Sequence, residues 1–304
     1  MAVITAALLE ALRSGYRREF QGAYDAARAA AFWSDVATLV PSSTKSNTYG
    51  WLGDFPSLRE WIGDRVVKNI KASGYQIENK LWEATVGINR TDIEDDNLGT
   101  YRPLVQDMGA AAARKPDEMI AALLAAGEAT LCYDGQNFFD TDHPVYPNHD
   151  GTGIAVSTAN FVTGALAAWY LLDCSRPLKP LIYQEREAPR FVSKTDPNTS
   201  DAVFTSNTYQ FGADMRSNVG FGFWQQAWKS KAALNAAAFD AAWAAMASFK
   251  ADGGRPLGIK PTHLLVPPAL RAAANEVVMV ERLASGASNA NYKAVEVVVV
   301  PWLA

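Results

Sequence analysis

The residues best suited to chemistry lie together in one short segment, FFDTDHPVYPNHD, at positions 138–150. Asp140, Asp142 and His143 fall within four positions, and His149 and Asp150 follow shortly after. Carboxylates and imidazoles at such spacing can bind a divalent metal ion and activate a water molecule. One hypothesis is therefore a metal-dependent enzyme that uses Asp140, Asp142 and His143.

The same segment is also explained by turns alone. Asp and Asn beside Gly and Pro are common turn formers, and His143-Pro144 favours an extended step. No HExxH or HxH pattern accompanies the segment. The third histidine, His263, stands in an apolar run, where a core or interface imidazole is the simpler interpretation. We therefore predict no catalytic residue, no metal ligand and no cofactor, and keep the metal-dependent enzyme as an alternative.

Other motifs of catalysis and nucleotide binding are absent from the sequence. The chain contains no GxGxxG, GxxxxGK[ST] or GxSxG pattern. Its two cysteines, Cys132 and Cys174, lack CxxC spacing, so we expect a reduced cytosolic protein with buried thiols rather than a disulfide. A net charge of −4 and a pI near 5.5 argue against nucleic-acid binding through a strong positive field.

Apolar periodicity predicts an amphipathic helix near the N-terminus. Apolar side chains recur at every fourth position, at Leu8, Leu12, Tyr16, Phe20 and Tyr24. We expect this helix to end near residue 35, and to lie either on its own core or, as an arm, on a neighbouring subunit. Glu10 and Arg13 interrupt the basic-then-apolar order of a signal peptide, so we expect the N-terminus to be retained.

Residues 64–90 are predicted to form a long β-hairpin or meander. β-Branched and aromatic residues at 66–70 and 75–88 alternate with charged ones, and Ser73-Gly74 supplies a turn. An isolated hairpin is only marginally stable in water, so one of this length must lie against something else. Just upstream, a compact aromatic patch is expected at Trp51, Phe55, Leu58 and Trp61.

A long helix is predicted for residues 101–126, after the acidic run at 92–96. Acidic residues ahead of a helix favour its start through the helix dipole, and Gly127 is a natural stop. Pro116 lies inside this helix and should kink it or split it into two rods. Residues 151–172 carry no charge, but polar and glycine residues fill most of them. Only 165–172 are strongly apolar, which we interpret as a short buried helix rather than a membrane span.

The rest of the chain alternates predicted strands and helices. Strands are expected at 131–139 and 181–192, before a polar loop at 196–201. The tract at 209–230 then combines strand alternation with five Phe and Trp side chains, which is typical of an element built to pack. An Ala-rich helix around 239–249 follows, then a strand at 262–266, a helix at 269–283 and a strand at 295–300.

With these elements in place, the chain resembles the major head subunits of Mu-like tailed bacteriophages and prophages. The resemblance covers nearly the whole chain and rests on segments that occur in the same order. They are YGWLGDFPSLREW (49–61), GINRTDIEDD (87–96), FFDTDHP (138–144), WYLLDCSRPLKPLIYQ (169–184), the tract at 209–230, GRPLGIKPTHLLVPPAL (254–270) and VVVVPWL (297–303).

The resemblance implies an α+β fold, the Hong Kong 97-type fold of phage major capsid proteins. Residues 1–47 would be an N-terminal arm, and 48–91 would contain an extended hairpin called the E-loop. Residues 92–234 would form a peripheral domain whose spine helix is the predicted helix at 101–126. Residues 235–304 would be largely an axial domain, ending in a C-terminal strand.

The resemblance also implies a structural function. Subunits would self-assemble as hexamers and pentamers into an icosahedral head that encloses double-stranded DNA without sequence-specific binding, and no membrane would be involved. Implied partners are a separate scaffold protein, a portal at one vertex and a decoration protein, with assembly in the host bacterial cytoplasm. The hairpin would lie across a neighbour, and its candidate inter-subunit contacts are Tyr75, Ile77, Trp82 and Ile88. A ring-forming tail or portal adaptor is the other alternative.

Overall fold

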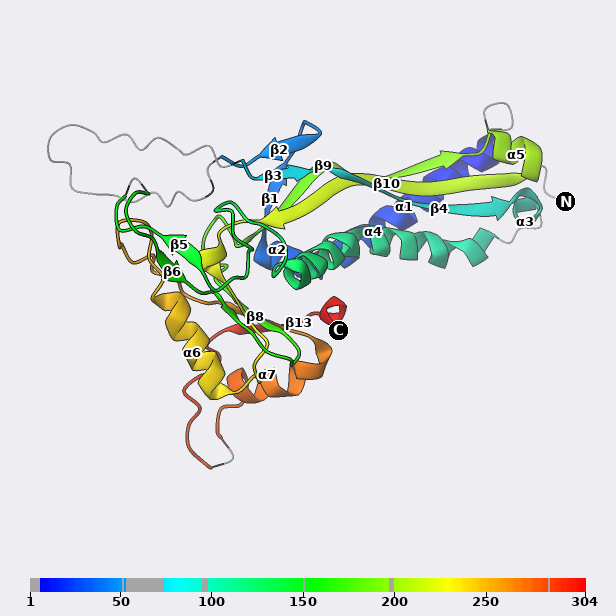
Figure 1. Cartoon of the computed structure of the whole chain (residues 1–304). Coiled ribbons are helices and arrows are strands. Elements are labelled where there is room, and N and C mark those ends of the chain that lie inside the picture. The colour runs from blue at the N-terminus through cyan, green and yellow to red at the C-terminus, as the bar shows by residue number, and fades with distance from the viewer. Residues whose placement is uncertain are drawn as a thin grey trace.

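The computed structural model describes residues 6–50, 52, 74–94, 98–149, 151–196, 200–283 and 285–304. They form a long body and a compact unit that lies beneath one end of it (Figure 1). The aromatic patch predicted at Trp51, Phe55, Leu58 and Trp61 lies outside the described residues, as do the first strand of the predicted hairpin and the end of the acidic run.

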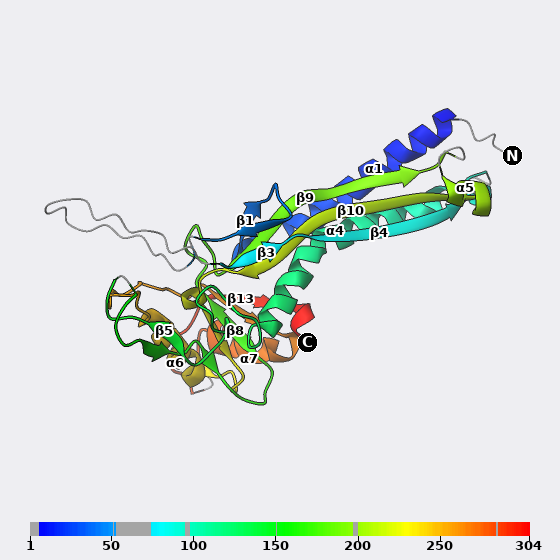
Figure 2. The same ribbon diagram turned by 45° about the horizontal axis from the view of Figure 1, so that its top comes forward.

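The centre of the long body is a pair of 14-residue strands, β9 (Leu181–Lys194) and β10 (Thr208–Phe221), which run antiparallel. At about 3.3 Å per residue each spans roughly 45 Å. β1 (Ala37–Pro41) runs parallel to β9, and β4 (Lys80–Asn89) runs antiparallel to β10 over its whole length (Figure 2). The second half of the predicted hairpin therefore has a partner in its own chain, which corrects the expectation that it needs a neighbouring subunit for stability.

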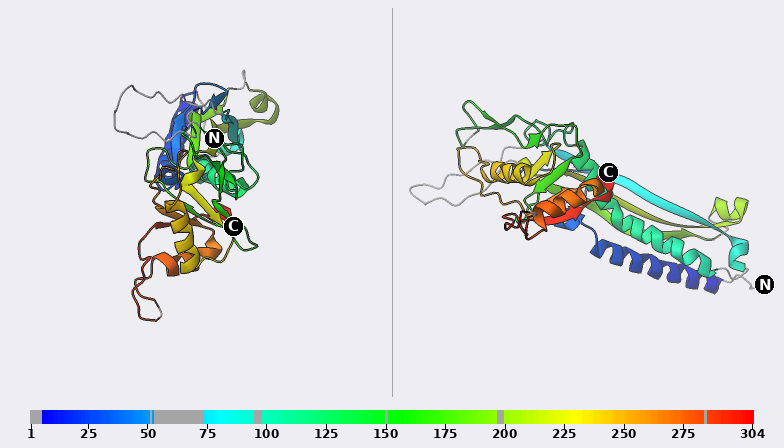
Figure 3. Two further views of the ribbon diagram at one scale, coloured as in Figure 1. Left: turned by 60° about the vertical axis from the view of Figure 1, so that its left-hand side comes forward. Right: turned by 90° about the horizontal axis from the view of Figure 1, so that it is seen from below.

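Helices α1 (Ala6–Ala29) and α4 (Leu98–Ala126) lie side by side along this sheet (Figure 3). The apolar stripe of α1 faces the chain's own sheet, because the Tyr16 ring lies 5.1 Å from Phe211 and the Phe20 ring 5.7 Å from Phe191. The two helices approach closely at Gly109, where an added Cβ atom would lie only 2.3 Å from the carbonyl oxygen of Phe20.

Both long helices depart from their predicted bounds. α1 ends at Ala29 rather than near residue 35, and the short helix α2 (Trp33–Val36) follows it. The carboxylate of Asp117 in α4 accepts a hydrogen bond from the backbone N–H of Trp33 at 2.9 Å, which fixes the start of α2. α4 continues as one helix through Pro103 and Pro116, so of the two predicted effects of Pro116, a kink or a split into two rods, the split does not occur.

The compact unit is built on a five-stranded sheet of order β13-β12-β8-β11-β7. Its strands are β7 (Phe161–Val162), β8 (Trp169–Leu172), β11 (Ala227–Ser230), β12 (His263–Val266) and β13 (Glu296–Val299). Helix α6 (Ala236–Ala247) contacts β11, and α7 (Arg271–Val278) contacts β12 and β13. The unit therefore draws its strands from the middle and from the end of the chain.

Short elements complete the described residues. Strand β2 (Ser46–Thr48) pairs with β3 (Gln76–Glu78), and β5 (His143–Val145) pairs with β6 (Val156–Thr158). The short helices are α3 (Arg90–Glu94) and α5 (Asp201–Ser206), with 3-10 turns at Trp224–Gln226, Pro268–Leu270 and Pro301–Leu303. None of the helices among the described residues combines the length and apolar composition needed to cross a lipid bilayer.

Two predicted elements are wrong. Residues 165–172 do not form a buried helix, because Trp169–Leu172 is the central strand β8, paired on both sides and fully buried. A strand buried on both faces is a continuous apolar run, which periodicity alone cannot distinguish from a short helix. Residues 131–139 form a turn with a single bridge between Leu131 and Asn137 rather than a strand. The helix predicted at 269–283 also ends early, at Val278.

The aromatic tract at 209–230 belongs to the chain's own core. It contains β10, a 3-10 turn and β11 in succession, and its five large apolar aromatics are all buried: Phe211, Phe221, Phe223, Trp224 and Trp228. The Phe221 ring stacks on Phe138 with a centroid distance of 4.0 Å. Phe211 joins the smaller core under α1, and the other four join the large core that spans both sheets.

Candidate functional site: a Cys132–Asp134–His143 cluster and the exposed apolar surfaces

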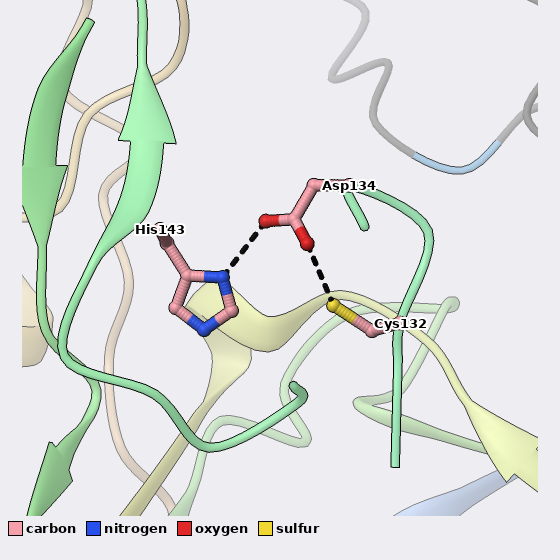
Figure 4. Close-up of side chains that lie close together, drawn as sticks. All are labelled: Cys132, Asp134 and His143. Carbon is pink, nitrogen blue, oxygen red and sulfur yellow. Dashed lines mark hydrogen bonds and ion pairs between the residues drawn. The ribbon is translucent and has the colours of Figure 1, made fainter. Parts of the chain in front are cut away.

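The structure brings His143 together with residues other than the predicted Asp140 and Asp142. The Nδ1 atom of His143 lies 2.8 Å from a carboxylate oxygen of Asp134, and the other oxygen of Asp134 accepts a hydrogen bond from the Cys132 thiol at 3.0 Å (Figure 4). Cys132 and Asp134 come from the turn after α4, whereas His143 begins β5. Among the described residues, these three form the one cluster of possible metal ligands.

The other predicted metal ligands lie elsewhere. Asp142 is exposed, and its pKa is raised by a hydrogen bond to Asp140 and by the charge of that carboxyl group. The ring of His149 packs over Gly253, whose added Cβ atom would meet the Nδ1 atom of His149 at 2.2 Å. Asp150 lies outside the described residues. The predicted set of Asp140, Asp142 and His143 is therefore not assembled as one group.

The order in which the three side chains are hydrogen-bonded decides the chemistry of the cluster. In a thiol nucleophile the imidazole contacts the sulfur and removes its proton, whereas here the Asp134 carboxylate stands between sulfur and imidazole. Burial, and then the Asp134 carboxylate, raise the pKa of the Cys132 thiol far above its ordinary value. A protonated thiol is neither a nucleophile nor a metal ligand. The cluster is therefore a chain of hydrogen bonds rather than a reactive site.

Asp134 acts as the acceptor that holds this part of the fold together. Burial alone would raise its pKa, but the hydrogen bonds from His143 and Cys132 outweigh burial and lower it. His143 also stacks on Trp224 with a centroid distance of 4.0 Å. The cluster thus fastens the turn at 131–139 to β5 and to the core. Asp134 carries no recognisable signal in the sequence, because it stands in an ordinary turn, YDGQN, nine positions before its histidine partner.

A second buried ionic group joins the long body to the compact unit. Lys229 in β11 has only 1% of its surface exposed, and its Nζ atom lies 2.6 Å from Glu128 and 3.2 Å from the carbonyl oxygen of Ala125. Lys231 reaches the same carboxylate at 2.8 Å. Burial lowers the pKa of Lys229, although Glu128 opposes this effect. Because a cation is favoured at a helix C-terminus, this group anchors the end of α4 to the five-stranded sheet.

Large apolar side chains are exposed at several places in the described residues, including the following three. Phe204 of α5, at the far end of the long body, is 82% exposed, and Ile154 and Val156 at the β5–β6 hairpin are 90% and 66% exposed. A third group lies in the C-terminal part of the compact unit: Met279, Val280, Leu283, Tyr292 and Trp302. Exposed apolar side chains mark an interaction surface where they form a contiguous patch.

The four predicted inter-subunit residues divide into two pairs. Ile77 and Ile88 are 3% and 1% exposed and pack in the chain's own core, so the expectation that they face a neighbour is wrong for this conformation. The physical reason differs for the two residues: Ile88 lies in β4, which pairs with β10, whereas Ile77 lies in β3, which pairs with β2. Tyr75 and Trp82 are half-buried, and Trp82 donates a hydrogen bond to the carbonyl oxygen of Ser217 at 3.2 Å. Contact of Tyr75 and Trp82 with a neighbour stays a prediction.

The chain is similar in sequence to phage head proteins over nearly its whole length. Residues 9–303 match the sequence model of the family described as Mu-like prophage major head subunit gpT. The chain belongs to this family of Mu-like major head subunits. It is 49% identical to the major capsid protein of Escherichia phage Mu, with 93% of each chain covered. It is 48% identical to the Mu-like prophage FluMu major head subunit of Haemophilus influenzae, with 91% of each covered.

Solved structures of the phage JBD30 show the same fold. The chain matches a subunit of the JBD30 procapsid with a TM-score of 0.85 and 56% identity, covering 98% of this chain and 100% of that one. It matches the JBD30 capsid with a TM-score of 0.78 and 44% identity, covering both chains completely. This head subunit is therefore an α+β structural component of the virion capsid and not an enzyme, which sets aside the metal-dependent alternative.

Proposed function

We propose that this head subunit assembles as hexamers and pentamers, which close into an icosahedral shell around double-stranded DNA. The observation that carries the proposal is the match to the JBD30 procapsid subunit over 98% of the chain, and the elongated body in Figure 1 is consistent with it. A long sheet with helices along it exposes much surface for its mass, and contacts with other copies would cover that surface.

The proposed division of the chain follows the Hong Kong 97-type plan. Residues 1–47 serve as the arm and 48–91 contain the E-loop. Helix α4 is the spine of a peripheral domain within 92–234, and 235–304 are largely axial. Strands β7, β8 and β11 share one sheet with β12 and β13, so we assign these three strands to the axial unit as well. The proposed axial unit therefore includes three strands that precede the boundary at residue 234.

Partners follow from the same proposal. A net charge of −4 suits a shell that surrounds DNA without wrapping it or reading its sequence. A separate scaffold protein, a portal at one vertex and a decoration protein complete the head, which forms in the bacterial cytoplasm. A decoration protein is supported by a JBD30 capsid decorated with minor capsid protein trimers, whose subunit matches 90% of this chain with 45% identity and a TM-score of 0.74.

Electron microscopy of the purified protein, with its scaffold co-expressed, tests the proposal. Closed shells built of six-fold and five-fold clusters are expected. Rings of one small, fixed copy number with no closed shells would instead indicate a tail or portal adaptor. A strictly monomeric product under the same conditions would refute assembly itself.

A further inference from the structure

The compact unit has two incompletely paired strand edges on opposite sides. In the sheet order β13-β12-β8-β11-β7, β13 is one edge, and the β5–β6 hairpin directly precedes β7 at the other. Strands about 4.8 Å apart place β13 and β7 roughly 19 Å from each other. The β5–β6 hairpin forms a separate two-stranded sheet. Figure 1 shows the hairpin and β13 on opposite sides of the unit, and Figure 2 agrees. Within the described strands, β13 pairs only with β12 and β6 only with β5.

The β13 edge borders an apolar groove with basic residues beside it. The groove has a volume of about 640 Å³, and Val297 and Val299 of β13 line it together with Met279, which follows α7. Met279 is 49% exposed, so a large apolar side chain faces solvent there. Arg271 and Lys293 also line the groove, both are exposed, and neither forms a salt bridge within the described part of the chain.

The hairpin on the opposite side offers complementary features. Ile154 lies two positions before Val156, the first residue of β6, and both side chains are largely exposed. Asp140 and Asp142 immediately precede β5, and neither has a cationic partner among the residues that the structure describes. The hairpin therefore presents apolar side chains near negative charge. The groove presents an apolar wall lined by two cations, Arg271 and Lys293, and by one carboxylate, Glu296, which lies 3.6 Å from His263.

We propose that the β6 edge of one copy of this chain binds in the β13–α7 groove of a second copy. Ile154 and Val156 fill the apolar groove, β6 adds to the free edge of β13, and Asp142 approaches the basic side of the groove. The two surfaces differ and lie on opposite sides, so the contact is heterologous and can repeat from copy to copy until a ring closes. This inference rests on the proposed function, because it takes the neighbouring copy in a capsomer as the partner.

A second copy is favoured over an unrelated partner because a single chain carries both halves of the contact. An unrelated protein would need only one of the two surfaces, and it would leave the other apolar edge exposed. Complementary charge on the two edges also opposes pairing of like edges, because two grooves or two hairpins would bring like charges together.

Engineered disulfides test the contact in assembled particles. A variant that carries both Val156→Cys and Val297→Cys is oxidised, and its chains are separated by electrophoresis without reductant. The expected result is a ladder of linked chains, because each copy can link to one neighbour on either side. Either single variant should remain at the level of the wild-type chain, whose two native thiols are buried or half-buried. Co-assembly of the two single variants should yield linked pairs and nothing longer.

The outcomes separate this inference from the proposed function. Closed shells in micrographs without a ladder from the double variant, and without linked pairs from the co-assembled single variants, would overturn the interface and leave the shell proposal intact. Linked pairs from Val156→Cys alone would also overturn it, because they indicate a symmetric contact. Failure of the wild-type chain to form shells would refute the proposed function and the inference with it. If the double variant forms no particles, the co-assembled single variants decide the question.

Discussion

Replacement of Gly109 by alanine tests how α1 is held on α4. The new Cβ atom would lie 2.3 Å from the carbonyl oxygen of Phe20 and 3.2 Å from the backbone nitrogen of Tyr24. Ordinary contacts of a Cβ atom begin near 3.4 Å, so the backbone of α1 must move away by roughly 1 Å. Backbone atoms cannot rotate aside as a side chain can. The substitution is therefore expected to weaken the packing between α1 and α4.

The expected magnitude follows from two opposing effects. Overpacking of a tight contact costs about 1–3 kcal/mol, whereas alanine favours a helix over glycine by about 1 kcal/mol. We therefore expect Gly109→Ala to lower the free energy of unfolding by up to about 2 kcal/mol. If α1 detaches instead, the loss is larger, because burial of Leu12, Tyr16 and Phe20 contributes about 1.5–3 kcal/mol for each side chain.

Urea denaturation of isolated subunits measures this effect, and limited proteolysis of α1 reports its detachment. Gly22→Ala is the matched control, because Gly22 is an exposed residue of α1 with no atom within 4 Å of an added Cβ. The control should be neutral or stabilising by up to about 1 kcal/mol. A Gly109→Ala subunit at least as stable as the wild type, with α1 equally resistant to protease, would refute the account of this helix pair.

Three further predictions concern buried charge and assembly. Lys229→Met should destabilise the subunit by about 1–3 kcal/mol, because the carbonyl oxygens of Leu124 and Ala125 lose a buried donor while Glu128 keeps Lys231. Lys231→Met, at a more exposed position, should cost less than about 1 kcal/mol. Equal losses in thermal unfolding would contradict the anchoring role of Lys229. Burial raises the pKa of Asp117 from 3.8 to about 6, so the ionised carboxylate opposes folding above that pH. Asp117→Asn should therefore raise the free energy of unfolding by about 1–3 kcal/mol over the wild type at pH 7.5, and this difference should vanish as the pH falls from about 6 to 4. A difference that does not change with pH would exclude the Asp117 carboxyl group as its source. Trp82→Ala should reduce the number of shells formed per folded subunit several-fold, with little change in the circular dichroism of the subunit. If the variant subunit unfolds instead, while the subunits that remain folded assemble normally, Trp82 belongs to the core.

Local patterns predicted the helices of the long body well. Apolar residues at every fourth position from Leu8 to Tyr24 identified α1, and the helical spacing ahead of Gly127 identified α4. Both signals lie within one element, which is why sequence alone reveals them. The face of α1 could not be assigned in advance, because an apolar stripe does not say whether it meets its own core or another chain.

Pairings between distant residues could not be predicted. The register of β4 on β10 joins Asn89 to Thr208, which lie 119 positions apart, and no local pattern specifies such a partner. Strand β8 was mistaken for a helix because it is apolar on both faces. The cluster of Asp134 with His143 was missed for the same reason as the β4 pairing, since the fold, and not the spacing, brings the carboxylate to the ring.

Electron microscopy of the assembled protein tests the central claim most directly. The account predicts closed icosahedral shells made of six-fold and five-fold clusters, in which each subunit keeps the long body and compact unit described above. Rings of a single fixed copy number, or subunits that remain monomeric with the scaffold present, would contradict it.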